Sequence, residues 1–327
     1  VPGSLVLVGG DPGIGKSTLL LQSANSISLK HSVLYVSAEE SAQQVRLRWE
    51  RLNGVESNLQ LLSETDLGIV IEELQSLKPE VAIIDSIQSL NNEELSGGPG
   101  SVGQVRECAS ELQHFAKQQN TALLLVGHVT KEGVLAGPKV LEHLVDVVLT
   151  FEGDRFASHR LLRAIKNRYG ATHELGVFEM QGKGLEEISN PSEIFLSGDS
   201  ASGVATIVAC EGTRSVAVDI QALISTTTYP SPRRTATGVE TNRLHQILAV
   251  IEKHMGLNLS RYDCYLAVAG GLEVDEPAAD LGIAAAIVSS YKNQMLPKRT
   301  VLIGEIGLGG QLRSVSQMLQ RLLEAER

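Results

Sequence analysis

The sequence predicts an α/β fold with a predominantly parallel sheet in its first half, and a separate α+β domain in its second half. In the first half, short apolar runs alternate with stretches of helical periodicity, as in a parallel sheet with helices on both faces. A turn-rich stretch at 185–203 interrupts this alternation. At roughly 150 residues per domain, the 327 residues suit two domains, which we place at 1–188 and 189–327.

The elements of the first half follow from the spacing of its apolar residues. Short, mostly β-branched or leucine-rich runs predict strands at 5–8, 33–36, 81–84, 123–126 and 145–149. Apolar residues recurring every three or four positions predict helices at 16–29, 42–52, 67–77 and 102–118. Because strands and helices alternate, neighbouring strands are expected to run parallel.

The second half predicts a different arrangement. Strands are expected at 205–210, 215–220, 265–269 and 300–303, with a long loop at 225–234 that is rich in Thr and Pro. An alanine-rich helix is expected at 278–291. A further helix carries one apolar stripe, formed by Leu244, Ile247, Leu248, Ile251 and Met255.

Composition excludes several classes of protein. A hydrophobic fraction of 43% with 31 glycines fits a globular chain and neither a disordered nor a fibrous one. No run approaches the ~20 apolar residues of a membrane span, and no signal peptide precedes the first strand, so a cytoplasmic location is expected. Three distant cysteines exclude a disulfide framework. The start without Met and the end within an apparent helix suggest a piece of a longer chain.

A glycine-rich segment links the first expected strand to the first expected helix. Its spacing, G-x-x-x-x-G-K-S, is that of a P-loop, in which backbone amides at a helix N-terminus surround phosphate groups. Lys16 is expected to neutralise β- and γ-phosphate oxygens, and Ser17 to ligate Mg²⁺. The predicted ATP or ADP site comprises Gly10, Asp11, Pro12, Gly13, Ile14, Gly15, Lys16, Ser17 and Thr18.

Acidic residues and a histidine follow three other expected strands. Asp85 ends an apolar run in the manner of a Walker B carboxylate, which holds Mg²⁺ through water. Glu39 and Glu40 follow the strand 33–36, where a general base for the attacking water would lie; an acid that merely begins a helix is the other interpretation. His128 could sense the γ-phosphate or be structural.

The net charge of −10 argues against binding nucleic acid through bulk charge. One segment, 155–168, carries five cations and no acid. Its last two cations, Lys166 and Arg168, could complete the ATP site of a neighbouring subunit or could simply be solvated at a strand edge. The residues alone leave these two interpretations open. The five cations are Arg155, Arg160, Arg163, Lys166 and Arg168.

Taken together, these motifs resemble those of the bacterial RadA/Sms family. Beyond the P-loop, the resemblance rests on the segments Glu-Glu-Ser at 39–41, Asp-Ser-Ile-Gln at 85–88, Pro-Gly-Ser-Val at 99–102, Gly-His-Val-Thr-Lys at 127–131 and Lys-Asn-Arg-Tyr-Gly at 166–170. It covers essentially the whole chain. It implies a RecA-like P-loop NTPase core followed by a Lon-protease-like domain.

The resemblance also implies a function. Members form hexameric ring ATPases that bind single-stranded DNA in the channel and drive branch migration or unwinding in homologous recombination. Glu39 would be the catalytic base, His128 the γ-phosphate sensor, and Lys166 and Arg168 cations acting in trans. The segments 94–104 and 129–139 would face DNA, and a recombinase filament is a possible partner. The candidate DNA contacts are Lys131, Lys139 and Arg106.

The sequence departs from the family in two places. The four-cysteine zinc module that precedes the core in the family is absent, so no zinc is expected, and the C-terminal domain is expected to stop short of the family's usual end. In an alignment to the Lon protease, Ala278 stands at the nucleophile position and Leu319 at the lysine position. Neither can act as nucleophile or base, so the domain is expected to be non-proteolytic. Weak candidates for phosphate contacts are Arg233, Arg234 and Arg313.

Two classes of function therefore remain. The first is an ATP-dependent DNA motor, in which Mg-ATP hydrolysis in an oligomeric ring drives movement on single-stranded DNA. The second is a nucleotide-gated DNA-binding or loading module without helicase activity of its own. Purified protein in a helicase assay separates the two, and an ATP-dependent protease is excluded by the missing Ser and Lys.

Overall fold

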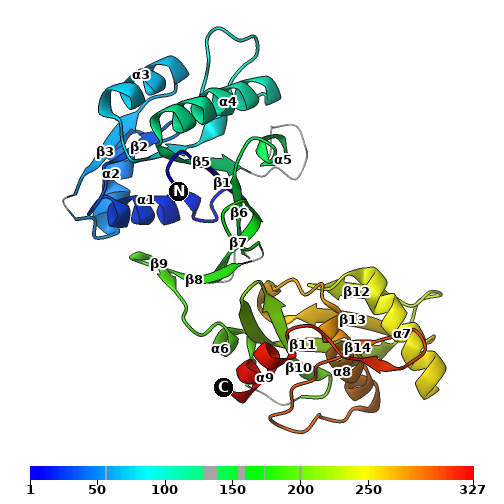
Figure 1. The fold of residues 1–327 in the computed structure, drawn as a ribbon. Coiled ribbons are helices and arrows are strands. Elements are labelled where there is room, and N and C mark those ends of the chain that lie inside the picture. Colours follow the sequence, from blue (N-terminus) through cyan, green and yellow to red (C-terminus); the bar gives the residue numbers. More distant parts are fainter. Residues whose placement is uncertain (56, 129–137, 154–158, 173, 199–200) are drawn as a thin grey trace. The chain divides into compact units, whose positions relative to one another are not determined.

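The computed structural model describes residues 1–327 except 56, 129–137, 154–158, 173 and 199–200 (Figure 1). The chain divides into two compact units, Val1–Ile188 and Ser189–Arg327. Each unit has a sheet and helices of its own.

The first unit is built on a nine-stranded sheet with the order β3-β2-β4-β5-β1-β6-β7-β8-β9. The six strands from β3 to β6 run parallel, and β7, β8 and β9 continue the sheet antiparallel. The strands are β1 (Leu5–Gly10), β2 (Val33–Ser37), β3 (Leu59–Ser63), β4 (Val81–Asp85), β5 (Ala122–His128), β6 (Val147–Glu152), β7 (His159–Asn167), β8 (Leu175–Gln181) and β9 (Gly184–Glu187).

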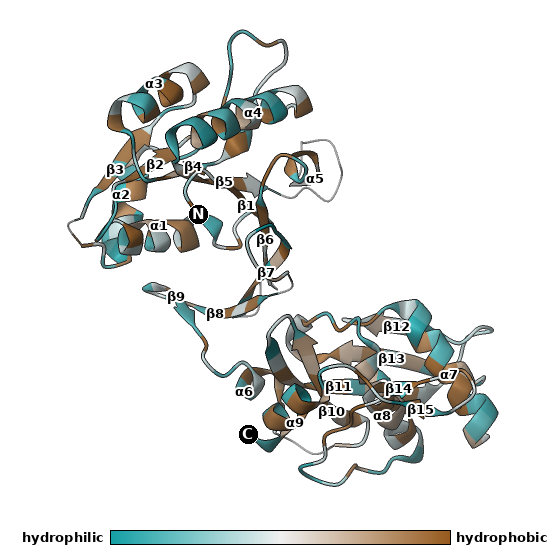
Figure 2. Ribbon diagram, viewed as in Figure 1, coloured by the Kyte–Doolittle hydropathy of each residue, from teal (hydrophilic) through white to brown (hydrophobic). Residues whose placement is uncertain are grey.

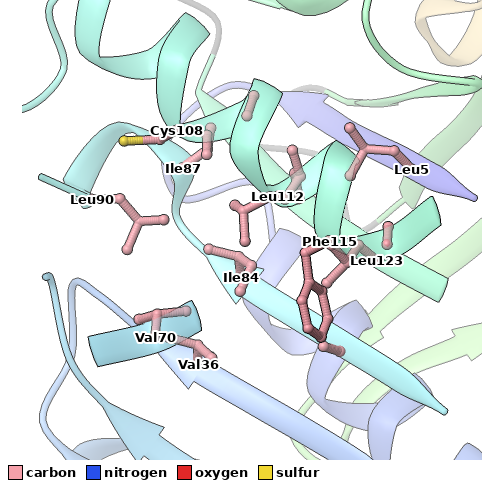
Figure 3. Packing of buried hydrophobic residues seen from close by; sticks show 14 of the residues in the cluster. Leu5, Val36, Val70, Ile84, Ile87, Leu90, Cys108, Leu112, Phe115 and Leu123 are labelled. Atoms are coloured by element: carbon pink, nitrogen blue, oxygen red, sulfur yellow. The ribbon is translucent and has the colours of Figure 1, made fainter. Parts of the chain in front are cut away.

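Helices cover both faces of the parallel part because successive strand residues point to opposite sides. Leu34 and Val36 join one core cluster with α3 and α4, whereas Val33 and Tyr35 join another with α1 and α2. Figure 3 shows the first cluster, and Figure 2 shows the mostly apolar strands beneath the polar outer side of α4. The helices are α1 (Lys16–Ile27), α2 (Ala42–Arg51), α3 (Leu67–Leu77), the 3-10 turn η1 (Ile87–Ser89), α4 (Val102–Gln119) and α5 (Pro138–Leu141).

The second unit has a four-stranded sheet with the order β10-β11-β13-β12, against which α8 packs. The strand pairs β10–β11 and β11–β13 are antiparallel, and β12–β13 is parallel. The elements are α6 (Ser192–Phe195), β10 (Val204–Glu211), β11 (Arg214–Thr226), β12 (Arg234–Thr237), α7 (Thr241–Met255), β13 (Tyr262–Val268), η2 (Ala269–Gly271), η3 (Pro277–Ala279), α8 (Asp280–Lys292), β14 (Glu305–Ile306), β15 (Leu312–Arg313) and α9 (Met318–Glu326).

The predicted α/β class of the first unit is confirmed, but two expectations for the second unit are wrong. The segment 300–303 is no strand: only Val301 forms a bridge, to Thr206, after a turn in which Arg299 has φ +56°. The loop expected at 225–234 is shorter, because β11 continues to Thr226 and β12 begins at Arg234. Both strands gain hydrogen bonds from pairing with β13, which a local pattern does not reveal.

A buried ion pair holds the C-terminal helix of the second unit. The Arg321 side chain on α9 is 1% exposed and forms a bidentate pair with Glu276. Its guanidinium also donates to the carbonyl oxygens of Val208, at 2.6 Å, and Ser316, at 3.0 Å. Removal of the guanidinium would leave the Glu276 carboxylate without its cation in a partly buried site, which is costly.

Arg321→Leu is therefore expected to lower the free energy of unfolding of the second unit by about 3–5 kcal/mol. Arg313→Ala is the matched control, because Arg313 is largely exposed and its contact with Glu305 is 3.5 Å long; it should cost less than about 1 kcal/mol. Urea unfolding followed by circular dichroism measures both. Equal effects of the two substitutions would contradict the role assigned to the buried pair.

Candidate nucleotide site

The P-loop connects β1 to α1, and two of its glycines are required by its backbone. Gly10 has φ +154°, and a Cβ there would lie 2.4 Å from the carbonyl oxygen of Phe151. Gly15 has φ +116°, and a Cβ there would lie 2.7 Å from Met180 Cε. Because no described side chain caps the first turn of α1, its amides are available to an anion.

The side chain of Lys16, the first residue of α1, folds back into the P-loop. Its ammonium donates to the carbonyl oxygens of Gly10, at 2.7 Å, and Asp11, at 2.9 Å. Burial lowers the pKa of this lysine, and the carboxylates of Asp85, Glu39 and Asp11 act in the opposite direction. A cation held by two weak carbonyl acceptors can exchange them for phosphate oxygens, which bind it more strongly.

Asp85 and Ser17 lie together beside the P-loop. Asp85 is buried at the end of β4, and burial raises the pKa of its carboxyl group. The Tyr35 hydroxyl donates to Asp85 Oδ2 at 2.6 Å, and the Ser17 side chain also hydrogen-bonds to this carboxylate. A hydroxyl oxygen and a carboxylate oxygen are hard donors of the kind that Mg²⁺ prefers, so these residues fit that ion.

Glu39 follows β2 and receives three hydrogen bonds on one carboxylate oxygen. His128 Nε2 lies 2.9 Å from Oε1, Ser89 Oγ lies 3.2 Å from it, and the Ser86 hydroxyl donates to the same atom. The hydrogen bond from His128 is the main reason that the pKa of Glu39 falls to about 2. The Glu39 side chain nevertheless remains 40% exposed.

Parallel register brings these residues to one edge of the sheet. Ser37 pairs with Asp85 in the β2–β4 ladder, and Gly10 pairs with His128 in the β1–β5 ladder. Glu39 lies two residues after Ser37. The carboxyl ends of β1, β2, β4 and β5 therefore contribute the P-loop, Glu39, Asp85 and His128, which are far apart in the sequence.

Glu40 points to a different partner. Its carboxylate pairs with Arg48 at 2.6 Å, and its carbonyl oxygen accepts a hydrogen bond from the Ser37 hydroxyl. Glu40 thus links the end of β2 to α2, whereas Glu39 faces Ser86 and His128.

Lys166 and Arg168 lie near the amino ends of the parallel strands, opposite the carboxyl ends that carry the P-loop. Lys166 pairs with Val148 near the start of β6, and its ammonium donates to the carbonyl oxygens of Glu142, at 2.5 Å, and Val145, at 2.8 Å. Arg168 pairs with Asp146 at 3.0 Å. Both cations are therefore separated from the P-loop of their own chain by the length of β6.

The candidate DNA contacts are only partly described. Lys131 and most of the segment 129–139 lie outside the described residues, and of Lys139 only the backbone, in α5, is described. Arg106 is exposed on α4. In the segment 94–104, Gln104 is buried and its amide donates to the carbonyl oxygens of Asn92 and Gly97, so this loop has an internal anchor.

Several residues of the site escaped prediction from the sequence. Tyr35 has the pattern of an ordinary strand residue. Ser86 belongs to the family motif at 85–88 without a role of its own, and Ser89 lies just outside that motif. Arg160 belongs to the basic segment 155–168, yet it is buried and its Nε donates to the carbonyl oxygen of Ile14 in the P-loop at 3.1 Å.

In the second unit, the two positions that the sequence predicts to align with the Lon catalytic pair are Ala278 and Leu319. Ala278 is buried in η3, and Leu319 is 73% exposed on α9. Among the described residues, no three His, Cys, Asp or Glu side chains gather as a metal site would require. No described helix is both long enough and apolar enough to cross a membrane.

Comparison with known proteins relates the chain to ATPases and to DNA repair proteins. Residues 1–134 match a family model described as an AAA domain, and residues 231–327 match one described as subunit ChlI of Mg-chelatase. A solved ATPase domain superposes with a TM-score of 0.50 at 12% identity, covering 58% of this chain and 86% of that one, so it shares the fold.

Other relatives are much closer in sequence. DNA repair protein RadA of Synechocystis is 56% identical, over 99% of this chain and 68% of the relative. Its counterpart in Streptococcus pneumoniae is 52% identical, over 99% of this chain and 78% of the relative. With this identity along nearly its whole length, the chain belongs to the RadA family of DNA repair proteins.

Proposed function

We propose that this chain is an ATPase of DNA repair and recombination that couples Mg-ATP hydrolysis in an oligomeric ring to single-stranded DNA. The observation that carries the proposal is the meeting of Lys16, Ser17, Asp85 and Glu39 at one sheet edge. The family supports the biological setting, since its members are named DNA repair proteins.

The P-loop supplies binding and charge neutralisation. Backbone amides at the start of α1 would receive phosphate oxygens, and Lys16 would move from its two carbonyl acceptors to the β- and γ-phosphates. Ser17 and Asp85 would hold Mg²⁺, with Asp85 acting through water. The bound ion would neutralise charge that develops on the phosphates. Tyr35 fixes the orientation of the Asp85 carboxylate.

Glu39 would orient the attacking water and accept its hydrogen bond. A carboxylate whose pKa is about 2 is ionised throughout the working pH range, so it can act on water without first losing a proton. His128 contacts this carboxylate and ends β5, beside the P-loop strand. It would therefore report the state of the γ-phosphate to Glu39 and to the segment that follows β5.

Lys166 and Arg168 would act on the ATP site of a neighbouring subunit. Their position near the start of β6, away from their own P-loop, supports an action in trans. Cations supplied in trans can accelerate phosphoryl transfer by ~10³ to 10⁵. Hydrolysis would then require assembly, which is the property of a ring motor. In this proposal the second unit contributes to assembly and DNA contact and has no peptidase activity.

The first test is steady-state ATP hydrolysis with and without single-stranded DNA, at low and moderate salt. Clear stimulation by DNA is expected, weakening as salt rises because phosphate contacts release counterions. Lys16→Ala should abolish turnover and serves as the blank. Turnover that ignores DNA would favour the nucleotide-gated loading module instead, and normal turnover in Lys16→Ala would refute the site assignment.

The pH dependence of kcat tests the state of Glu39. Because its pKa is lowered to about 2, Glu39 becomes protonated only well below its ordinary pKa of 4.5. No acid limb from Glu39 is therefore expected between about pH 5 and pH 8.5. The profile is measured at saturating Mg-ATP for the wild type and Glu39→Asp. A limb near pH 6 that moves in Glu39→Asp would contradict an ionised Glu39.

Lys166→Ala tests the proposed action in trans. Nucleotide binding, measured as the rise in Tm with Mg-ATP, should be retained, because Lys166 is remote from its own P-loop. ATP turnover should fall at least ~100-fold, since a trans-acting cation stabilises the transition state. Lys183→Ala, an exposed lysine in the turn between β8 and β9, is the control. Unchanged turnover in Lys166→Ala would contradict the action in trans, and Lys166 would then have a structural role through the carbonyl oxygens of Glu142 and Val145.

A further inference from the structure

The hydroxyls of two serines, Ser86 and Ser89, donate hydrogen bonds to the Glu39 carboxylate. Ser86 follows β4 directly, and Ser89 ends the 3-10 turn η1 that begins at Ile87. Residues three apart eclipse each other in a 3-10 helix, so the two hydroxyls lie on the same side of the turn. Their Oγ atoms are 3.3 Å apart, and the amide of Ser89 donates to the carbonyl oxygen of Ser86 at 3.2 Å.

The core fixes this turn in place. Ile87 and Leu90 are fully buried in the cluster formed by α3, α4 and the sheet (Figure 3), and Ser86 is also fully buried. A buried hydroxyl without a partner would be costly, and Ser86 satisfies its own by donating to Glu39. The turn therefore presents two hydroxyls as a rigid pair of donors.

The two carboxylate oxygens of Glu39 differ in their hydrogen bonds. Ser86, Ser89 and His128 all hydrogen-bond to Oε1, whereas Oε2 has no hydrogen bond to a described residue. A carboxylate held through one oxygen presents the other in a defined direction, because its plane is fixed by the donors. Oε2 is then the atom left to accept a hydrogen bond from water.

We propose that Ser86 and Ser89 are positioning residues that hold Oε1 of Glu39, so that Oε2 faces the attacking water. This inference rests on the proposed function, in which Glu39 orients that water. The two serines differ from His128 in origin: they follow β4 and Asp85, which would hold Mg²⁺ through water, whereas His128 ends β5. The serines would keep the Glu39 carboxylate at a fixed position relative to Asp85 and the ion that it holds. His128 would supply the contact that responds to the bound nucleotide.

The experiment measures single-turnover ATP hydrolysis and ATP affinity in the full chain, for Ser86→Ala, Ser89→Ala and the double variant. Each single substitution should lower the hydrolysis rate about tenfold, and the double variant more, because small misplacements of a reacting group are costly. The dissociation constant for ATP should stay within about twofold. Ser89→Thr retains the hydroxyl and should restore the rate. Ser23→Ala on α1, whose hydroxyl bonds only to the Leu19 carbonyl among described groups, is the matched control.

A double-mutant cycle with Glu39→Gln separates positioning from a structural role. If the serines act through Glu39, Ser86→Ala should have little further effect on the residual rate in the Glu39→Gln background. Two outcomes would overturn this inference but not the proposed function. In the first, Ser86→Ala lowers the hydrolysis rate equally in the wild-type and Glu39→Gln backgrounds. In the second, the serine variants hydrolyse ATP at the wild-type rate while Glu39→Gln is inactive. A wild-type rate in Glu39→Gln would overturn the proposed role of Glu39 itself. Thermal unfolding of each variant shows whether Ser86→Ala folds, and the more exposed Ser89 provides the test if it does not.

Discussion

The structure of the first unit depends on the parallel, in-register pairing of β2, β4, β5 and β1. Because these strands end at the same edge, residues between 10 and 128 in the sequence come together there. No single segment holds the site. The P-loop supplies Lys16 and the backbone amides at the start of α1, β4 supplies Asp85, and the turn after β4 supplies Ser86 and Ser89. The residues that follow β2 and end β5 are Glu39 and His128. The two core clusters, one on each sheet face, fix these strand ends relative to one another.

At the amino ends of the same parallel strands, the structure gathers two cations and one buried carboxylate, those of Lys166, Arg168 and Asp146. Asp146 accepts the amide of Leu5 at 3.0 Å and pairs with Arg168, so it ties the start of β1 to the end of β7. Lys166 is held nearby by two carbonyl oxygens. The candidate nucleotide site therefore lies at the carboxyl ends of the parallel strands, and Lys166 and Arg168 lie at the other end. The proposed function requires that two copies of the chain bring these two ends together.

The sequence predicted the parallel strands β1, β2, β4, β5 and β6 and the helices α1 to α4, because these elements follow from local pattern. It did not predict β3 or the antiparallel strands β7, β8 and β9. The helix expected at 67–77 and the strand expected at 81–84 agree with α3 and β4 to within one residue. Contacts made through tertiary structure were not predictable. Nothing local indicated that Tyr35 meets Asp85, that Ser86 and Ser89 share one oxygen of Glu39, or that Arg160 reaches the P-loop. The strand expected at 300–303 failed for the same reason: an apolar run becomes a strand only where a neighbour pairs with it.

The central claim is that one ATP site needs residues from two chains, and mixing two inactive variants tests it most directly. Lys16→Ala lacks a working P-loop but keeps Lys166, whereas Lys166→Ala keeps its P-loop but lacks the trans cation. When the two are mixed and reassembled, some interfaces combine an intact P-loop with an intact Lys166, so ATP turnover should reappear and peak near equal proportions. If mixed assemblies form and remain inactive at every ratio, Lys166 does not act across the subunit interface.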